Sequence, residues 1–460
     1  MTRFTPQDGT HLIDGEIGPY VSFDELYSFA PHWARTQARL DPFYSNLWGS
    51  PSSASWIDRR TLTLYENAGT PLSRRMKRMS GDIDPHEFWT NSRSNGFIKD
   101  TLASVMMWRT MTCDQMAAVT GRREWMGHHY ASMPQAADRL VAAAMLKVGT
   151  LPRVPAFKPP TLLSPGRMSS WQSFCEQLDF DEWLAITAGQ TVDATIGSSM
   201  VRHTVATTEL ALRIAQFAPV DAVAGEHLGA HRTLVPSIRS AALAHAKYAA
   251  ADAVIVMPDG RLVAIEMTVS KHNTAAKVRR WSETMAYDSS ERTSVLFVTA
   301  PAPGKPRQVS SLTRRHVKDE LARVRATMGV DYSNRFFVAD WEQWFPAPGR
   351  ITSRFASLPV QVCDNGEWTW VDLLSDDFAW TPKTDAHVAN AGTSVVAMNM
   401  LRGIPHFQRD DELAADARKR LDIVNVMSRF EALPVLSEHR ATSAPDRSDW
   451  MRPPSLLDDA

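Results

Sequence analysis

The sequence predicts an α/β protein in which a small helical unit precedes a mixed sheet flanked by helices. Three observations lead to this class. Residues 97–150 show three short helical patterns followed by a strand and a turn, residues 151–170 are rich in proline, and residues 171–340 alternate between helical and strand patterns. The order of elements in residues 97–150 is typical of a winged helix-turn-helix, a common DNA-binding motif.

Composition limits the possible classes of protein. The chain has 460 residues, 44% apolar and 22% charged, which excludes a fibrous or wholly disordered protein. Its 50 Lys and Arg nearly balance its 51 Asp and Glu, so overall charge favours neither nucleic acid nor membrane. Three scattered cysteines outside any CxxC pattern indicate a reducing cytoplasm. Without a long apolar run or an apolar segment near the start, we expect neither a membrane span nor a secretory signal.

Proline, tryptophan and turn residues suggest where the domains end. Five prolines between residues 151 and 170 predict a linker. Five tryptophans and a turn at Asp364-Asn365-Gly366 mark a separate C-terminal region that contains a hairpin. The expected regions are therefore an N-terminal extension (1–83), a winged helix (84–150), a Pro-rich linker (151–170), an α/β domain (171–340) and a Trp-rich C-terminal module with a loose tail (341–460).

The helical unit contains a recognisable helix start. Thr112 can cap a short helix, and Gln115 stands three residues later, which is the spacing of a capping box. Helices are expected over residues 97–108 before it and 134–144 after it, because apolar residues recur there at helical spacing. We expect the second of these helices to be an exposed recognition helix or to lie just behind one.

The α/β domain is predicted from alternating patterns. Apolar runs and turn signals give the order helix, strand, strand, helix, strand, helix, strand. The expected ranges are, in chain order, 203–217, 251–257, 261–269, a basic helix ending near 287, 294–298, 312–328 and 336–339.

Two carboxylates on the first two strands of this domain carry the strongest chemical signal. Asp252 opens one strand and Glu266 lies late in the next, so a hairpin between them can bring both to one end of a sheet. Two hard oxygen ligands that lie close together suit Mg²⁺ or Mn²⁺, which can activate water and stabilise a phosphoryl transition state. The alternative is that Glu266 is a structural strand residue paired with a nearby Arg or Lys.

Local clusters of cations could contact a phosphate backbone. One cluster comprises Arg74, Arg75, Lys77 and Arg78. In the helical unit, the candidates for DNA contact are Arg122, Arg123 and Arg139, because guanidinium groups pair bidentately with phosphate or guanine. Residues 271–325 carry 12 Lys and Arg against 5 Asp and Glu, and Arg279 and Arg280 belong to this stretch. For each cluster, an ordinary solvated surface is the alternative interpretation.

The segment that joins Asp252 to Val263-Ala264-Ile265-Glu266, Lys271 and a basic helix resembles the PD-(D/E)xK restriction-endonuclease-like fold. More narrowly, it is similar to the bacterial replication-relaxation family of actinobacterial plasmids and mobile elements. That family also places a winged helix before its nuclease-like domain. The helix that begins His203-Thr204-Val205 resembles the family's His-led helix, and Glu226 stands where the family tends to have an acidic residue. The resemblance covers residues 95–300.

The resemblance implies a nuclease-like site but also shows a departure from it. The active form of the fold has a Lys two residues after the Glu, and this chain has Thr268 there. If the site is active, Asp252 and Glu266 would hold Mg²⁺ or Mn²⁺, and Lys271 or Lys277 would replace the missing Lys. Glu226 or Glu209 would be an outer acidic partner.

Three functions remain open at this stage. The resemblance favours a cytoplasmic DNA-binding protein that nicks DNA or handles an origin during mobilisation or replication. Thr268 favours a catalytically dead nuclease fold that serves as a DNA-binding accessory. The 15 tryptophans, several in the C-terminal third, favour a structural or assembly protein that contacts other proteins.

Overall fold

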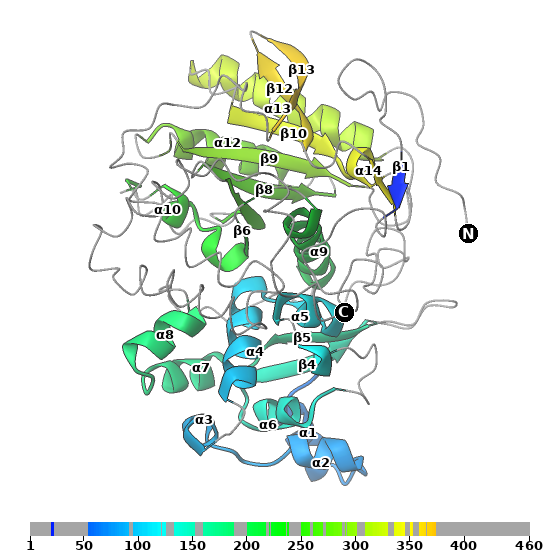
Figure 1. The fold of residues 1–460 in the computed structure, drawn as a ribbon, viewed down its shortest axis with the longest axis vertical. Helices are drawn as coiled ribbons and strands as arrows, with labels where there is room; N and C mark the ends of the chain where they lie inside the picture. The colour runs from blue at the N-terminus through cyan, green and yellow to red at the C-terminus, as the bar shows by residue number, and fades with distance from the viewer. Residues whose placement is uncertain are drawn as a thin grey trace, which may run out of the picture.

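A computed structural model describes the parts of the chain that form the two main sheets and their helices. The described residues are 20–22, 54–91, 95–120, 122–125, 133–151, 160–187, 200–217, 220, 222–235, 237–238, 250–257, 261–269, 273–287, 290, 292–300, 309–329, 335–345, 350–352, 358–364 and 366–373. They form two packed units, here called the N-terminal unit (residues 54–187) and the sheet unit (residues 200–373), which lie at the bottom and top of Figure 1.

The N-terminal unit is a helical cluster on a four-stranded sheet with the order β2-β4-β5-β3. Its elements are β2 (Ser55–Ile57), α1 (Arg59–Asn67), α2 (Arg74–Met79), α3 (Pro85–Asn91), α4 (Asn95–Trp108), β3 (Met111–Thr112), α5 (Cys113–Thr120), η4 (Arg123–Trp125), α6 (Gln135–Ala142), β4 (Leu146–Thr150), β5 (Thr161–Pro165), α7 (Met168–Cys175) and α8 (Phe180–Thr187).

Helix α4 forms the centre of this unit. Every residue from 100 to 108 is buried, as expected for a helix with other elements packed around it. The expected capping box at the start of α5 is confirmed. The backbone N–H of Gln115 donates to Thr112 Oγ1 at 3.1 Å, and the backbone N–H of Thr112 donates to Gln115 Oε1 at 3.0 Å.

The sheet unit contains a seven-stranded mixed sheet with the order β13-β12-β10-β9-β8-β7-β6. Its elements are α9 (Val201–Phe217), β6 (Ala222–Gly225), η7 (Glu226–Leu228), α10 (His231–Leu234), β7 (Ala253–Val256), β8 (Leu262–Thr268), α12 (Thr274–Met285), β9 (Thr293–Thr299), α13 (Val309–Met328), β10 (Phe336–Asp340), α14 (Trp341–Trp344), β12 (Pro359–Asp364) and β13 (Glu367–Asp372). A two-stranded ribbon pairs β1 (Tyr20–Ser22) with β11 (Arg350–Thr352).

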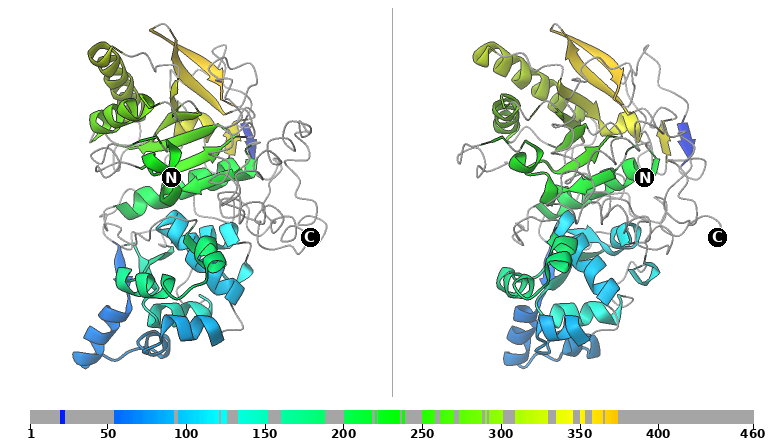
Figure 2. Two further views of the ribbon diagram at one scale, coloured as in Figure 1. Left: turned by 90° about the vertical axis from the view of Figure 1, so that its left-hand side faces the viewer. Right: turned by 60° about the vertical axis from the view of Figure 1, so that its left-hand side comes forward.

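The pairing of neighbouring strands changes twice across the seven-stranded sheet, from antiparallel to parallel and back to antiparallel. Strands β6, β7 and β8 are antiparallel neighbours, β8, β9 and β10 are parallel, and β12 and β13 return antiparallel. Parallel neighbours need crossover connections, and α12 and α13 supply them. These two helices lie side by side against the sheet (Figure 2). Strands β8 and β9 are buried along their whole lengths, which explains their continuous apolar character.

Three expected boundaries differ from the structure. The expected extension includes α1, α2 and β2, which pack on the N-terminal unit, and β2 pairs with β4. The Pro-rich segment 151–170 includes β5 and the start of α7, so the N-terminal unit continues to α8. The hairpin β12–β13 joins the main sheet through β10 rather than forming a separate module. The proline, tryptophan and turn-residue content of these segments therefore does not mark the limits of the units.

The two units meet at a close backbone contact. A Cβ atom added to Gly225, at the end of β6, would lie 2.2 Å from the carbonyl oxygen of Met107 in α4, so only glycine fits there. A second link is polar: the Gln115 amide donates to the Val205 carbonyl at 2.9 Å and to Glu209 Oε2 at 3.2 Å. Helix α9 therefore contacts the N-terminal unit as well as β6 and β7.

No helix among the described residues is long and apolar enough to cross a membrane.

Candidate functional site

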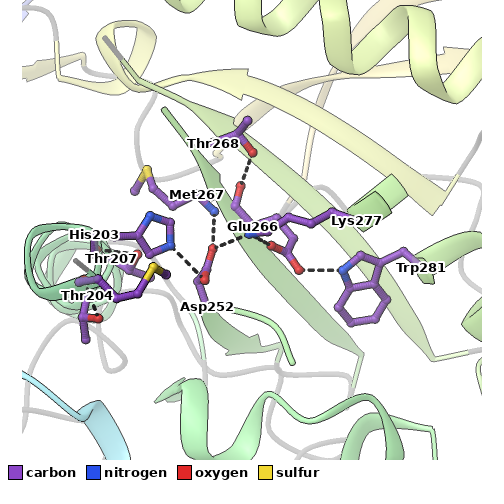
Figure 3. A network of polar contacts seen from close by, with 10 residues as sticks. His203, Thr204, Thr207, Asp252, Glu266, Met267, Thr268, Lys277 and Trp281 are labelled. Atoms are coloured by element: carbon purple, nitrogen blue, oxygen red, sulfur yellow. Dashed lines mark hydrogen bonds and ion pairs between the residues drawn. The ribbon is translucent and has the colours of Figure 1, made fainter. Parts of the chain in front are cut away.

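The hairpin β7–β8 brings the two predicted carboxylates together. Its register pairs Ala253 with Ile265, so the next residues, Asp252 and Glu266, are cross-strand neighbours. The backbone N–H of Asp252 also donates to the Ile265 carbonyl at 2.9 Å. The convergence expected from the sequence is thus present, at the end of β8 that leads into α12 (Figure 3).

Lys277 supplies the cation at this pair. Its Nζ lies 3.3 Å from Asp252 Oδ2 and also donates to Glu266 Oε2. Helix α12 begins a few residues after β8 and turns back along the sheet, so its first turn passes over the end of the strand. Of the two lysines expected to replace the one missing at Thr268, Lys277 is the one found here; Lys271 lies outside the described residues.

Three further groups hold the carboxylates. His203 Nε2 lies 2.9 Å from Asp252 Oδ1, and the backbone N–H of Met267 donates to Asp252 Oδ2 at 2.8 Å. Trp281 Nε1 donates to Glu266 Oε1 at 2.7 Å. All four carboxylate oxygens therefore have a protein partner (Figure 3).

The two carboxylates differ in exposure and in pKa. The Glu266 side chain is fully buried, whereas that of Asp252 is 12% exposed. Burial raises the pKa of Glu266 to about 7, with Lys277 opposing the shift and Asp252 adding to it. Burial also opposes ionisation of Asp252, but His203 and Lys277 hold its pKa below the ordinary value.

Lys277 remains charged in this setting. Burial disfavours its ammonium group, but the attraction of Asp252 and Glu266 is stronger and raises its pKa above the ordinary value. One ammonium group faces two carboxylates, so this cluster has a surplus of negative charge while the imidazole of His203, 2.9 Å from Asp252 Oδ1, is neutral.

The carboxylates of Asp252 and Glu266 are the available ligands for the implied Mg²⁺ or Mn²⁺. The described residues contain no group of three or more His, Cys, Asp and Glu arranged to hold a metal ion. Magnesium usually binds through one or two carboxylates, with water and substrate phosphate completing its shell. Asp252 and Glu266 fit that need, because a carboxylate offers about four lone pairs and each of theirs uses only part of them. Lys277 would have to move from its bridging position.

Glu226, Arg279 and Arg280 are also predicted site residues. The contacts given above for the Asp252–Glu266 pair do not include them. Glu226 follows Gly225, whose pairing with Ala253 places the Glu226 backbone beside Asp252 on the neighbouring strand. Arg279 is exposed on α12, and Arg280 Nη1 lies 3.7 Å from Glu283 Oε2 on the same helix.

The cationic segment 74–78 forms α2, and half of it faces inward. Arg75 and Arg78 pair with the fully buried Asp138 of α6, at 2.7 and 2.8 Å. Arg74 and Lys77 are exposed, and the side chain of Arg78 is still 41% exposed. Helix α2 therefore packs on α6, the expected recognition helix, and covers part of it.

Two of the remaining predicted DNA contacts also have protein partners. Arg122 donates to Asp100 Oδ2 at 2.7 Å, which fixes its guanidinium against α4. The guanidinium of Arg139 stacks over the Phe88 ring at 4.5 Å, although the residue is exposed. The side chain of Arg123 lies outside the description.

The sequence does not predict two residues of the site. It marks His203 only as the start of a helix, and nothing in its position indicates contact with Asp252. Trp281 could have been found, because it stands four residues after Lys277 and so shares its helix face. Behind it, the His231 ring packs on Trp281, with ring centroids 3.8 Å apart, and bonds Thr284 Oγ1.

Comparison with protein-family models, characterised proteins and solved structures finds no match to this chain.

Proposed function

We propose that the protein is a cytoplasmic DNA-processing protein of a plasmid, phage or other mobile element, and that Asp252, Glu266 and Lys277 form a metal-dependent nicking site. The convergence of these three side chains carries the proposal. It supplies the two carboxylates and the displaced Lys that the resemblance to restriction-endonuclease-like and replication-relaxation proteins implies. A divalent cation held by Asp252 and Glu266 would lower the pKa of water and neutralise charge on a phosphoryl group.

The roles of the chain's own residues follow from their charge and exposure. Lys277 stays protonated, so it serves as an electrostatic partner for a phosphate oxygen and not as a general base. Its side chain is 14% exposed and that of His203 is 15% exposed, so both can meet a substrate at the sheet edge. Glu266 is fully buried, so it would hold the cation from the inner side of the site. The hydrogen bond from Trp281 Nε1 fixes its orientation.

Exposed cations favour a nucleic acid as the partner. Arg74 and Lys77 on α2 and Arg279 on α12 are exposed. Cations of this kind release counterions when they meet a phosphate backbone, so DNA affinity should fall steeply as salt concentration rises.

A second function is favoured by a specific observation. Every oxygen of Asp252 and Glu266 already has a protein partner, and Lys277 occupies the space between them. A nuclease fold that has lost activity and serves as a DNA-binding accessory would also have this closed ion-pair cluster.

The experiment that separates the two functions is nicking of supercoiled plasmid with Mg²⁺ or Mn²⁺. Glu266→Gln keeps the shape and the bond from Trp281 but removes a carboxylate oxygen. We expect the wild type to nick and Glu266→Gln to lose at least 100-fold in rate, with DNA retention on a gel nearly unchanged. Glu283→Gln, the same chemical change at a carboxylate of α12 whose side chain is 41% exposed, is the matched control and should keep the nicking rate within about threefold.

Two results would contradict the proposed nicking activity. Wild-type protein that retains DNA but never nicks it with either cation would favour the accessory function. Nicking that persists in Glu266→Gln would place the activity elsewhere. Failure to retain any duplex or single strand at low salt would contradict both functions.

A further inference from the structure

A cavity lies on the helical face of the sheet unit, away from the Asp252–Glu266 pair. It has a volume of about 370 Å³ and is bounded by α12, α13, β10 and the hairpin β12–β13. Small-molecule sites in proteins occupy roughly 300–1,000 Å³ and are mostly apolar with a few polar groups. The size of this cavity therefore suits a small organic ligand.

The lining of the cavity combines apolar walls with positive charge. Leu321, Phe336 and Trp368 supply apolar and aromatic surface. Lys318 and Arg325 supply two cations, and no Asp or Glu is among the described residues that line it. Such a lining attracts an anion and rejects a cation.

Lys318 is held at the cavity by uncharged groups. Its Nζ donates to Gln361 Oε1 at 2.7 Å and lies 4.4 Å from the centre of the Trp368 ring. Burial and the nearby Arg314 lower its pKa to about 8, although Asp340 and Cys363 act in the opposite direction. An anion in the cavity would relieve the desolvation of this ammonium group.

Arg325 lies two turns after Lys318 on α13 and also lines the cavity. Its Nη1 lies 3.8 Å from the place where a Cβ on Gly366 would stand, at the turn of the hairpin. Gly366 has a φ of 92°, a backbone conformation that favours glycine. It stands at the turn of the hairpin that bounds this side of the cavity. The two cations therefore reach the cavity from positions 318 and 325 of α13, and Trp368 reaches it from β13 of the hairpin.

We propose that this cavity binds a small aromatic anion, with the flat ring against Trp368 and Leu321 and the acidic group toward Lys318 and Arg325. A phosphate, sulfonate or carboxylate group on a single ring or on two fused rings fits both the charge and the volume of the cavity. The proposal does not depend on DNA processing at Asp252 and Glu266.

The test is calorimetric titration of the full chain with 1-naphthyl phosphate. Uncharged 1-naphthol and non-aromatic cyclohexyl phosphate are the control probes. We expect saturable one-to-one binding of 1-naphthyl phosphate and at least tenfold weaker binding of either control, because each lacks one of the two features that the cavity recognises.

Three variants assign the binding to the cavity. Lys318→Gln keeps a donor near Gln361 but removes the charge, and should weaken the affinity at least tenfold. Ala322→Trp adds a large side chain at an exposed position in the lining and should abolish binding without removing any contact. Arg315→Gln, an exposed change on the same helix, should leave the affinity within twofold.

Two results would overturn the proposal. One is the absence of saturable binding of 1-naphthyl phosphate to the wild type at millimolar concentration. The other is binding that Ala322→Trp leaves within twofold of the wild type, which would place the probe elsewhere. Because Ala322 is exposed, this variant keeps the test decisive even if Lys318→Gln fails to fold.

Discussion

Two buried carboxylate clusters in this protein have opposite charge balances. In the N-terminal unit, the single carboxylate of Asp138 is held by two guanidinium groups, from Arg75 and Arg78. In the sheet unit, the two carboxylates of Asp252 and Glu266 share the single ammonium of Lys277. The first cluster has two cations for one carboxylate, and the second has one cation for two carboxylates while His203, which also contacts Asp252, is neutral.

This difference separates a structural cluster from a candidate functional one. A buried charge is tolerated when it is fully paired, and Asp138 is, so nothing further is needed there. At Asp252 and Glu266 the surplus of negative charge can be met by a proton on Glu266 or by a second cation. Burial is the main cause of the raised pKa of Glu266, and the negative charge of Asp252 adds to it.

The largest effect is expected from Asp138→Ala. The change removes the carboxylate partner of Arg75, whose side chain is 11% exposed, while its bonds to the Met133 and Pro134 carbonyls remain. Removing one member of a buried ion pair costs about 3–5 kcal/mol, so the free energy of unfolding in urea should fall by that amount.

A surface pair is the matched control for this variant. Asp82 lies 2.7 Å from Arg59 but is 83% exposed, so Asp82→Ala should cost less than about 1 kcal/mol. Equal losses from both variants would contradict the structural role given to Asp138.

A somewhat smaller loss is expected from Lys277→Met. Two adjacent buried carboxylates would remain without their cation, but a proton on Glu266 would offset part of the repulsion. We therefore expect a loss of about 2–4 kcal/mol at neutral pH, measured by urea unfolding, and a smaller loss at pH 5. Arg279→Met, on the exposed side of α12, should stay within about 0.5 kcal/mol. A loss that does not depend on pH would argue against a charge surplus at this site.

A pH profile distinguishes Glu266 from the neighbouring His231. The folded-state pKa of Glu266 is raised to about 7 from an ordinary 4.5, so its stabilising contribution is present below pH 4.5 and disappears as pH rises to 7. Burial, with Arg280 and Lys277, lowers the pKa of His231 to about 3 from 6.5. Its contribution is present above pH 6.5 and disappears as pH falls toward 3.

The corresponding variants should change the profile in opposite directions. Relative to wild type, Glu266→Gln should gain stability as pH rises from 4.5 to 7, and His231→Asn should gain stability as pH falls from 6.5 to 3. Each change should amount to about 1–3 kcal/mol, followed as the melting temperature across pH. Parallel profiles for wild type and Glu266→Gln would show that Glu266 is ionised throughout.

The local signals in the sequence predicted the elements well and the boundaries poorly. The capping box at Thr112 and Gln115 and the strands around Asp252 and Glu266 follow from spacing of a few residues, and the structure confirms them. The pairing of β12 with β10 depends on contacts between distant segments, and proline or tryptophan content does not encode it. Composition therefore misplaced the limits of the units.

The site shows the same division. The hairpin pattern predicts that Asp252 and Glu266 converge, and Lys277 is a candidate because the resemblance implies a lysine that Thr268 does not supply. The sequence could not indicate that His203 reaches Asp252 from α9, since that contact depends on how α9 packs on β7. It also could not show that Arg75 and Arg78 turn toward Asp138, because a cationic run looks the same whether it faces solvent or a buried carboxylate.

The most direct test of the charge surplus at Asp252 and Glu266 is Mn²⁺ binding to the full chain, followed by loss of the free-ion signal in electron paramagnetic resonance. The account predicts one Mn²⁺ site in the wild type, tighter binding in Lys277→Met, and at least tenfold weaker binding in the Asp252→Asn, Glu266→Gln double variant. Removing the competing ammonium should favour the ion, and removing both negative charges should abolish its attraction. Mn²⁺ binding that is the same in all three proteins, or undetectable in both the wild type and Lys277→Met, would contradict it.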